Sequence, residues 1–166
     1  MATPVSARQP ESLRVSRWRW RTLVRELARR GHGERESGAF LLARAGDESR
    51  RVAACVYFDD IDPTALNGAI SIRGEKFVRL WAICKECGMR VIADVHTHPG
   101  SGVRQSTIDA ANPMVAKRGH IGIILPHFAQ RDATPEHAGV HVYAGDRSWR
   151  SAYGAEAAAL LRRTWI

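Results

Sequence analysis

Residues 93–109 read ADVHTHPGSGVRQSTID, the end of an apolar strand followed by a loop that carries three candidate metal ligands. On a strand, residues two apart point to the same side, so His96 and His98 are predicted to offer both imidazoles to one ion. Pro99 ends the strand. Ten residues then separate His98 from Asp109, enough for a loop that returns a carboxylate. Two imidazoles and a carboxylate, with a fourth position open to water, are typical of a catalytic zinc site.

Other interpretations of the same residues stay open. A lone His-x-His pair also occurs by chance at the end of a strand. Ser106 and Asp109 match a capping box, in which a serine caps a helix and an acid follows three residues later; a capping serine can still donate to a ligand. Other His-x-His metalloenzymes fit less well. No His-x-His-x-Asp-His pattern is present, the chain is too short for a barrel amidohydrolase, and Gly102 and Val103 stand where a cupin would place a glutamate.

The segments before this stretch alternate between strands and a helix. Apolar side chains at i, i+3, i+4 and i+7 spacing predict an amphipathic helix over residues 17–30, with Ser16 as its N-cap and a short strand at 13–15. Residues 37–44 and 51–58 are predicted to be strands joined by a turn at 46–49, and residues 59–67 a loop. The apolar positions of the helix are Trp20, Leu23, Val24 and Leu27.

The remaining segments continue the alternation without a repeat or a linker. The sequence therefore predicts one α/β (α+β) domain over residues 12–166, preceded by a flexible tail at residues 1–11. The predicted helices are 74–86, 106–116 and 155–163, the predicted strands are 90–97, 120–126 and 139–143, and 132–137 is a loop.

Composition narrows the functional classes. A chain of 166 residues with 45% hydrophobic and 25% charged residues is typical of one soluble globular domain. No apolar run approaches the ~20 residues of a membrane span, and the N-terminus lacks a secretory apolar region. Three cysteines do not make a disulfide framework, so a reducing, cytoplasmic location is expected. Cys84 and Cys87 have redox or zinc-knuckle spacing but no second pair, and are predicted to be structural.

The charge balance favours an acidic partner. The 25 basic and 17 acidic residues give a formal charge of +8, which suits an acidic protein surface, nucleic acid or an anionic membrane. Only three of the basic residues are lysines, however, and a GC-rich coding bias would also give 22 arginines. Neither nucleic acid nor a membrane is expected as the partner.

The combination of His96-Thr97-His98-Pro99 with Ser106-x-x-Asp109 resembles the signature of the JAMM (JAB/MPN) metalloproteases. Residues 36–43 read ESGAFLLA, which is similar to the family's upstream Glu-x-x-Gly-x-x-x-Gly strand, with alanines at 39 and 43 in place of glycines. Glu34 competes with Glu36 as the family's glutamate, but Glu36 has the better register. The resemblance covers about residues 12–145. It implies a mixed central sheet flanked by helices, similar to the cytidine deaminase fold.

The resemblance also implies a site and a chemistry. One zinc ion per chain would be held by His96, His98 and Asp109. Glu36 would take a proton from the attacking water and deliver it to the leaving amine. Ser106 would donate a hydrogen bond to the developing oxyanion.

The function implied by the resemblance is that of a zinc-dependent isopeptidase or peptidase. The bond that such an enzyme would hydrolyse is the amide after the C-terminal tail of a ubiquitin-like protein, either in deconjugation or in precursor processing. The chain looks most similar to stand-alone bacterial members found beside ubiquitin-like, activating and conjugating proteins, including those of antiphage systems. Two alternatives stay open: a small-substrate zinc peptidase or amidase of metabolism, and a non-catalytic scaffold. The intact set of Glu36, His96, His98 and Asp109 argues against the scaffold.

Overall fold

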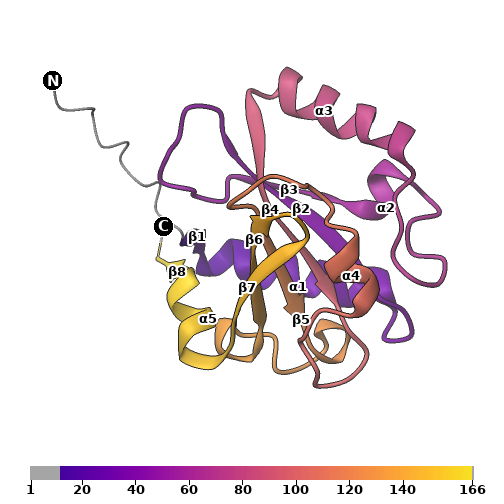
Figure 1. Cartoon of the computed structure of the whole chain (residues 1–166), viewed down its shortest axis with the longest axis vertical. Coiled ribbons are helices and arrows are strands. Elements are labelled where there is room, and N and C mark those ends of the chain that lie inside the picture. Colours follow the sequence, from indigo (N-terminus) through magenta and orange to yellow (C-terminus); the bar gives the residue numbers. More distant parts are fainter. Residues whose placement is uncertain (1–11, 166) are drawn as a thin grey trace, which may run out of the picture.

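The computed structural model describes residues 12–165, so the tail predicted at 1–11 lies outside the described residues. A six-stranded mixed sheet forms the centre, in the order β3-β2-β4-β5-β6-β7 (Figure 1). β4 and β5 run parallel, and every other neighbouring pair in this sheet is antiparallel. The strands are β2 Gly38–Arg44, β3 Ala54–Tyr57, β4 Met89–Thr97, β5 Ile121–Leu125, β6 Gly139–Gly145 and β7 Ser148–Ala152.

Helices cover both faces of this sheet. Alternate residues of β2 point to opposite faces: Leu41 packs in one apolar cluster with Leu23 and Leu27 of α1, and Phe40 packs in another with Leu80 of α3. The mixed sheet flanked by helices, expected from the sequence, is therefore confirmed. The helices are α1 Arg17–Gly31, α2 Phe58–Ile61, α3 Phe77–Glu86, α4 Thr107–Ala111 and α5 Gly154–Leu160, with single 3₁₀ turns η1 Gly74–Lys76, η2 His127–Ala129 and η3 Pro135–His137.

The first helix begins where the sequence predicts. The Ser16 hydroxyl accepts a hydrogen bond from the backbone N–H of Arg19, which satisfies one of the free donors of the first turn. The predicted apolar stripe faces the core, and the indole N–H of Trp20 donates to the carbonyl of Ala133. Among the helices of the described residues, none is long and apolar enough to cross a bilayer.

Two helix predictions were too long. The predicted helix 106–116 ends at Ala111, two residues before Pro113; the residue before a proline avoids helical dihedrals. The predicted helix 155–163 ends at Leu160. The chain then forms a short strand, β8 Leu161–Thr164, which pairs in parallel with β1 Leu13–Ser16 in a separate two-stranded sheet. Leu13 and Leu161 are partners in that pairing and both are buried.

The sequence also missed two short elements. β7 follows β6 in a hairpin whose turn places Asp146 and Arg147 at positive φ; aspartate tolerates that conformation better than most residues. Its residues, SWRSA, are largely polar because the strand lies at the edge of the sheet. The predicted loop 59–67 overlaps α2, which already begins at Phe58, a residue expected to end a strand.

Candidate metal centre

Three side chains converge at the carboxyl end of β4. The Nε2 atoms of His96 and His98 lie 3.2 Å apart, and the Asp109 Oδ2 atom lies 3.7 Å from the first and 3.5 Å from the second. In the described part of the chain, these three residues form the single cluster of His, Cys, Asp or Glu groups compact enough to hold a metal ion. β4 therefore supplies His96, the residue directly after the strand is His98, and α4 supplies the third candidate ligand.

The donor separations fit zinc. Zinc bonds of about 2.1 Å at tetrahedral angles place neighbouring donor atoms about 3.4 Å apart, and the observed separations are 3.2 to 3.7 Å. The donor set of two imidazoles and one carboxylate is also one that zinc accepts in catalytic sites, where a fourth position stays open. The residues present thus fit the expected ion.

The loop after β4 holds His98 in a metal-binding orientation. The Nδ1–H of His98 donates to the carbonyl of Gly102 at 3.0 Å, which leaves the Nε2 lone pair for an ion. The next carbonyl, of Val103, accepts from Nε2 of the buried His141 at 3.0 Å. Gly139 allows this approach, because an added Cβ there would collide with the Val103 carbonyl oxygen.

The start of α4 orients the third ligand. The predicted capping box is present: the Ser106 hydroxyl accepts from the Asp109 N–H, and Asp109 Oδ2 accepts from the Ser106 N–H at 2.8 Å. The same carboxylate oxygen faces both imidazoles. The cap thus fixes a ligand and leaves the Ser106 O–H proton free to donate elsewhere.

Electrostatics keep the carboxylate ionised. Burial raises the pKa of Asp109, but hydrogen bonds with His96 and His98 outweigh this and hold the pKa well below its usual range. Burial lowers the pKa of His98, while the hydrogen bond with Asp109 and the charge of Glu36 raise it, for a net increase. Glu36 therefore lies near enough to His98 for its charge to act on that side chain.

The backbone explains how Glu36 reaches this position. Gly38 on β2 pairs with His96 on β4, and the pairing extends one residue further, since the Thr97 N–H donates to the Ser37 carbonyl at 3.0 Å. The Ser37 N–H in turn donates to the Thr97 hydroxyl at 3.0 Å. In this antiparallel register Glu36 comes opposite His98. Glu34 precedes it by two residues and is exposed at the turn after α1.

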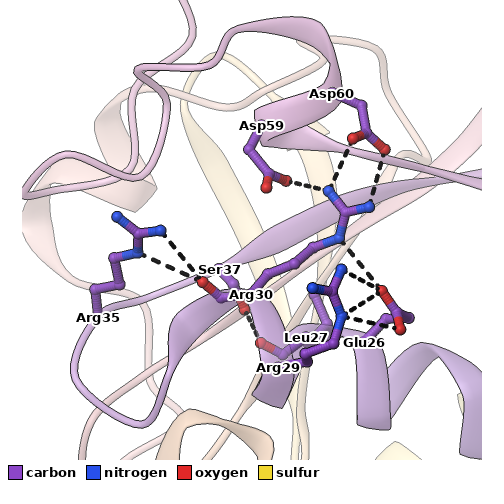
Figure 2. A network of polar contacts seen from close by, with 8 residues as sticks. All are labelled: Glu26, Leu27, Arg29, Arg30, Arg35, Ser37, Asp59 and Asp60. Carbon is purple, nitrogen blue, oxygen red and sulfur yellow. Dashed lines mark hydrogen bonds and ion pairs between the residues drawn. The ribbon is translucent and has the colours of Figure 1, made fainter.

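A polar network secures the backbone on both sides of Glu36 (Figure 2). The Ser37 hydroxyl donates to the carbonyl of Leu27 at 2.8 Å, and the Arg35 guanidinium donates to the carbonyl of Arg30. Arg30 itself forms ion pairs with Asp59 and Asp60 of α2. The end of α1 thus anchors the segment that carries the glutamate.

Removing one anchor tests this description. Ser37→Ala is expected to lower the free energy of unfolding by about 1–2 kcal/mol, because a buried hydrogen bond is lost. Urea denaturation measures the change. The matched control is Ser101→Ala, at an exposed position, with an expected change within about 0.5 kcal/mol. Equal stabilities of the two variants would contradict an anchoring role for Ser37.

Three predicted site residues, His96, His98 and Asp109, are brought together, and Ser106 hydrogen-bonds Asp109. Two residues that were not selected from the sequence, Asp94 and His141, lie near them. Asp94 and His141 line a cavity beside His96, and His120 hydrogen-bonds Asp94. For Asp94 a signal existed, since it is a charged residue inside an otherwise apolar strand. His141 had no such signal because its role depends on contact with a distant loop.

The cysteine pair does not contribute to the centre. Cys84 is buried in the apolar cluster under α3, and burial raises the pKa of its thiol. Cys87 is exposed at the end of that helix. Neither belongs to the metal-compatible cluster found in the described residues. Cys84 thus has the core position expected of a structural cysteine, whereas Cys87 does not.

No protein-family model matches the chain. Among solved structures, a protein of Desulfitobacterium hafniense is similar with a TM-score of 0.63 and 13% identity, over 92% of this chain and 94% of that one. A protein of Salinibacter ruber has a TM-score of 0.56 and 22% identity, over 84% and 88%. A JAB1/MPN domain protein of Archaeoglobus fulgidus has a TM-score of 0.49 and 18% identity, over 82% and 93%. At these identities, the first two likenesses establish a shared fold.

Proposed function

We propose that this chain is a zinc metalloprotease of the JAMM type, an isopeptidase or peptidase that hydrolyses the amide bond after the C-terminal tail of a ubiquitin-like protein. The observation that carries the proposal is the metal-compatible trio with Glu36 beside it. His96, His98 and Asp109 have donor separations suited to zinc. Continuing the pairing of Gly38 with His96 by two residues would put Glu36 opposite His98. The motif around these residues supports the family assignment.

Each residue of the site has a separate role in the proposed hydrolysis. Zinc held by the trio would polarise the scissile carbonyl and lower the pKa of water. Glu36 accepts the proton of the attacking water and returns it to the leaving amine. Ser106 donates its free O–H to the oxyanion that develops on the carbonyl oxygen. Because its pKa is lowered, Asp109 stays ionised at neutral pH, and only the ionised carboxylate can bind the metal.

A groove beside Glu36 suits an extended tail. It has a volume of about 520 Å³ and is lined by Glu36, Leu66, Gly68, Pro99 and Phe128, among others. A flexible tail ending in glycine can lie in such a groove and bond to the loop backbone, without side-chain specificity. A bulky folded chain cannot enter it.

The body of the partner would supply selectivity. The net charge of +8 favours acidic residues on the ubiquitin-like protein, with an association rate that falls as salt rises. The resemblance to stand-alone bacterial members supports a cytoplasmic pathway, of antiviral function, whose activating and conjugating enzymes are further partners.

The test is a fusion of a candidate ubiquitin-like protein to a reporter through its tail. Zinc-loaded protein is expected to cleave immediately after the terminal glycine of the tail, as read by mass spectrometry of both products. Raising the salt concentration should slow cleavage at low substrate concentration. Efficient cleavage of unrelated short peptides, with no preference for a folded partner before the scissile bond, would instead support a small-substrate peptidase.

A further inference from the structure

A second hollow borders the metal centre and is lined by His96 and Asp109, neither of which lines the groove beside Glu36. It has a volume of about 490 Å³, within the range of small-ligand sites. Its floor is the face of the sheet that also packs α3, and it lies between α3 and α4. The floor residues are Asp94 and His96 of β4, Gly122 and Ile124 of β5, and His141 of β6. Of the residues that line it, the proposed chemistry at the metal uses only His96 and Asp109.

The lining of this cavity contains no lysine or arginine among the described residues, although the chain as a whole is basic, with 25 basic residues and a net charge of +8. Two carboxylates line it: Asp109, whose charge the proposed zinc ion would neutralise, and Asp94, which the metal does not use. The walls are apolar and partly aromatic, with Phe77, Ile108 and Trp149 among them. An acidic floor under aromatic walls favours a cation with an apolar stem.

Asp94 is the deep carboxylate, and among the described residues no hydrogen bond to its Oδ2 atom is found. The residue is 5% exposed, and its Oδ1 atom accepts a hydrogen bond from Nε2 of the equally buried His120 at 2.7 Å. The Oδ2 atom lies next to Gly122 on the cavity floor, 3.9 Å from where a Cβ on that glycine would stand. A buried carboxylate is costly unless it is paired. A basic group in the cavity would supply the second partner.

We propose that this cavity binds a lysine or arginine side chain on the amine side of the scissile bond, with its charged end at Asp94. The position relative to the bond rests on the proposed function. A tail in the groove beside Glu36 places its last carbonyl at the metal. The next residue would then enter the cavity, because two of the proposed metal ligands, His96 and Asp109, line it. The released extension would therefore begin with a basic residue.

The experiment compares three peptide amides that differ in one side chain: Gly-Gly-Lys, Gly-Gly-norleucine and Gly-Gly-Glu. Norleucine keeps the apolar stem and lacks the charge. Zinc-loaded wild-type protein is expected to prefer lysine to norleucine in kcat/KM by about tenfold, the size of one largely desolvated cation contact. The glutamate peptide should be the poorest substrate. Equal values for lysine and norleucine would overturn the assignment.

Two variants locate the contact. Asp94→Asn keeps the shape of the side chain and is expected to abolish the preference for lysine while leaving the norleucine peptide within about twofold of wild type. Gly122→Ala adds a methyl group to the floor at ordinary contact distances. Among the three peptides, it should lower kcat/KM most for the lysine peptide. The matched control is Gly74→Ala, where an added Cβ meets nothing within 4 Å. A full preference for lysine in Asp94→Asn protein of normal zinc content would overturn the assignment.

Calorimetry separates this inference from the proposed function. The same peptides are titrated into zinc-loaded Glu36→Gln protein, in which binding is measured without hydrolysis. If the lysine peptide binds more tightly but the wild-type protein hydrolyses neither the peptides nor the fusion, the proposed function is rejected. The binding of a basic side chain in the cavity is then still supported. If the fusion is hydrolysed but the three peptides bind with equal affinity, the assignment of the cavity is rejected and the proposed function is kept.

Discussion

Replacing His96 and His98 together by alanine is expected to reduce bound zinc from close to one ion per chain to none, and to abolish hydrolysis. Each histidine supplies an Nε2 donor, and one remaining carboxylate cannot hold zinc against buffer. Elemental analysis of protein purified without chelator gives the stoichiometry. Asp109→Ala should also lose zinc, because it removes the oxygen that faces both imidazoles.

Two controls distinguish this site from others. His137→Ala removes an exposed histidine whose ring bonds Thr134, and should leave zinc unchanged. A variant with Cys84 and Cys87 both changed to serine should also keep its zinc. Stoichiometric zinc in the His96→Ala/His98→Ala protein would place the ion at the cysteines and reject the proposed metal centre.

Local signals predicted the strand that carries His96 and ends directly before His98, and the cap that presents Asp109. The alternation of a strand fixes which side chains share a face, whatever the rest of the chain does. A capping box is equally local, since Ser106 and Asp109 satisfy each other within one turn. The grouping of the three candidate ligands was therefore readable before the fold was known, and their convergence in the structure agrees with it.

Long-range pairing explains what the sequence did not reveal. The pattern of residues 161–164 continues a helix acceptably, and only the presence of β1 as a partner turns these residues into β8. The polar residues of β7 likewise show no strand alternation of their own, because an edge strand with one covered face needs few apolar residues. Tertiary contacts outweigh local propensity in both places.

The cavity could not be predicted from the sequence either, because tertiary contacts create it. Its floor combines residues from three strands that are distant in sequence, including Asp94, Gly122 and His141. In the sequence, Asp94 and Gly122 are each a single residue that interrupts an apolar strand, and neither indicates a cavity. Their shared surface appears only when β4, β5 and β6 lie side by side. Specificity is thus harder to infer from sequence than the metal ligands are.

Changing Glu36 to glutamine is expected to preserve fold and zinc content and to lower kcat by ~10²–10⁴-fold, the usual contribution of a general base. Glutamine has the same shape and cannot accept the proton. The anchors of the segment belong to its neighbours Arg35 and Ser37, so the backbone should not move. Stopped-time assays on the reporter fusion give kcat, and elemental analysis confirms the zinc.

The matched control is Glu34→Gln, two residues earlier on the same segment. Glu34 is exposed, whereas Glu36 is half-buried, lines the groove and comes opposite His98 in the register of β2 and β4. The control should therefore retain nearly full turnover. If Glu34→Gln is inactive and Glu36→Gln is not, the glutamate has been assigned two residues too late. The zinc site would survive that result, because none of its three ligands lies on the segment that carries Glu34 and Glu36.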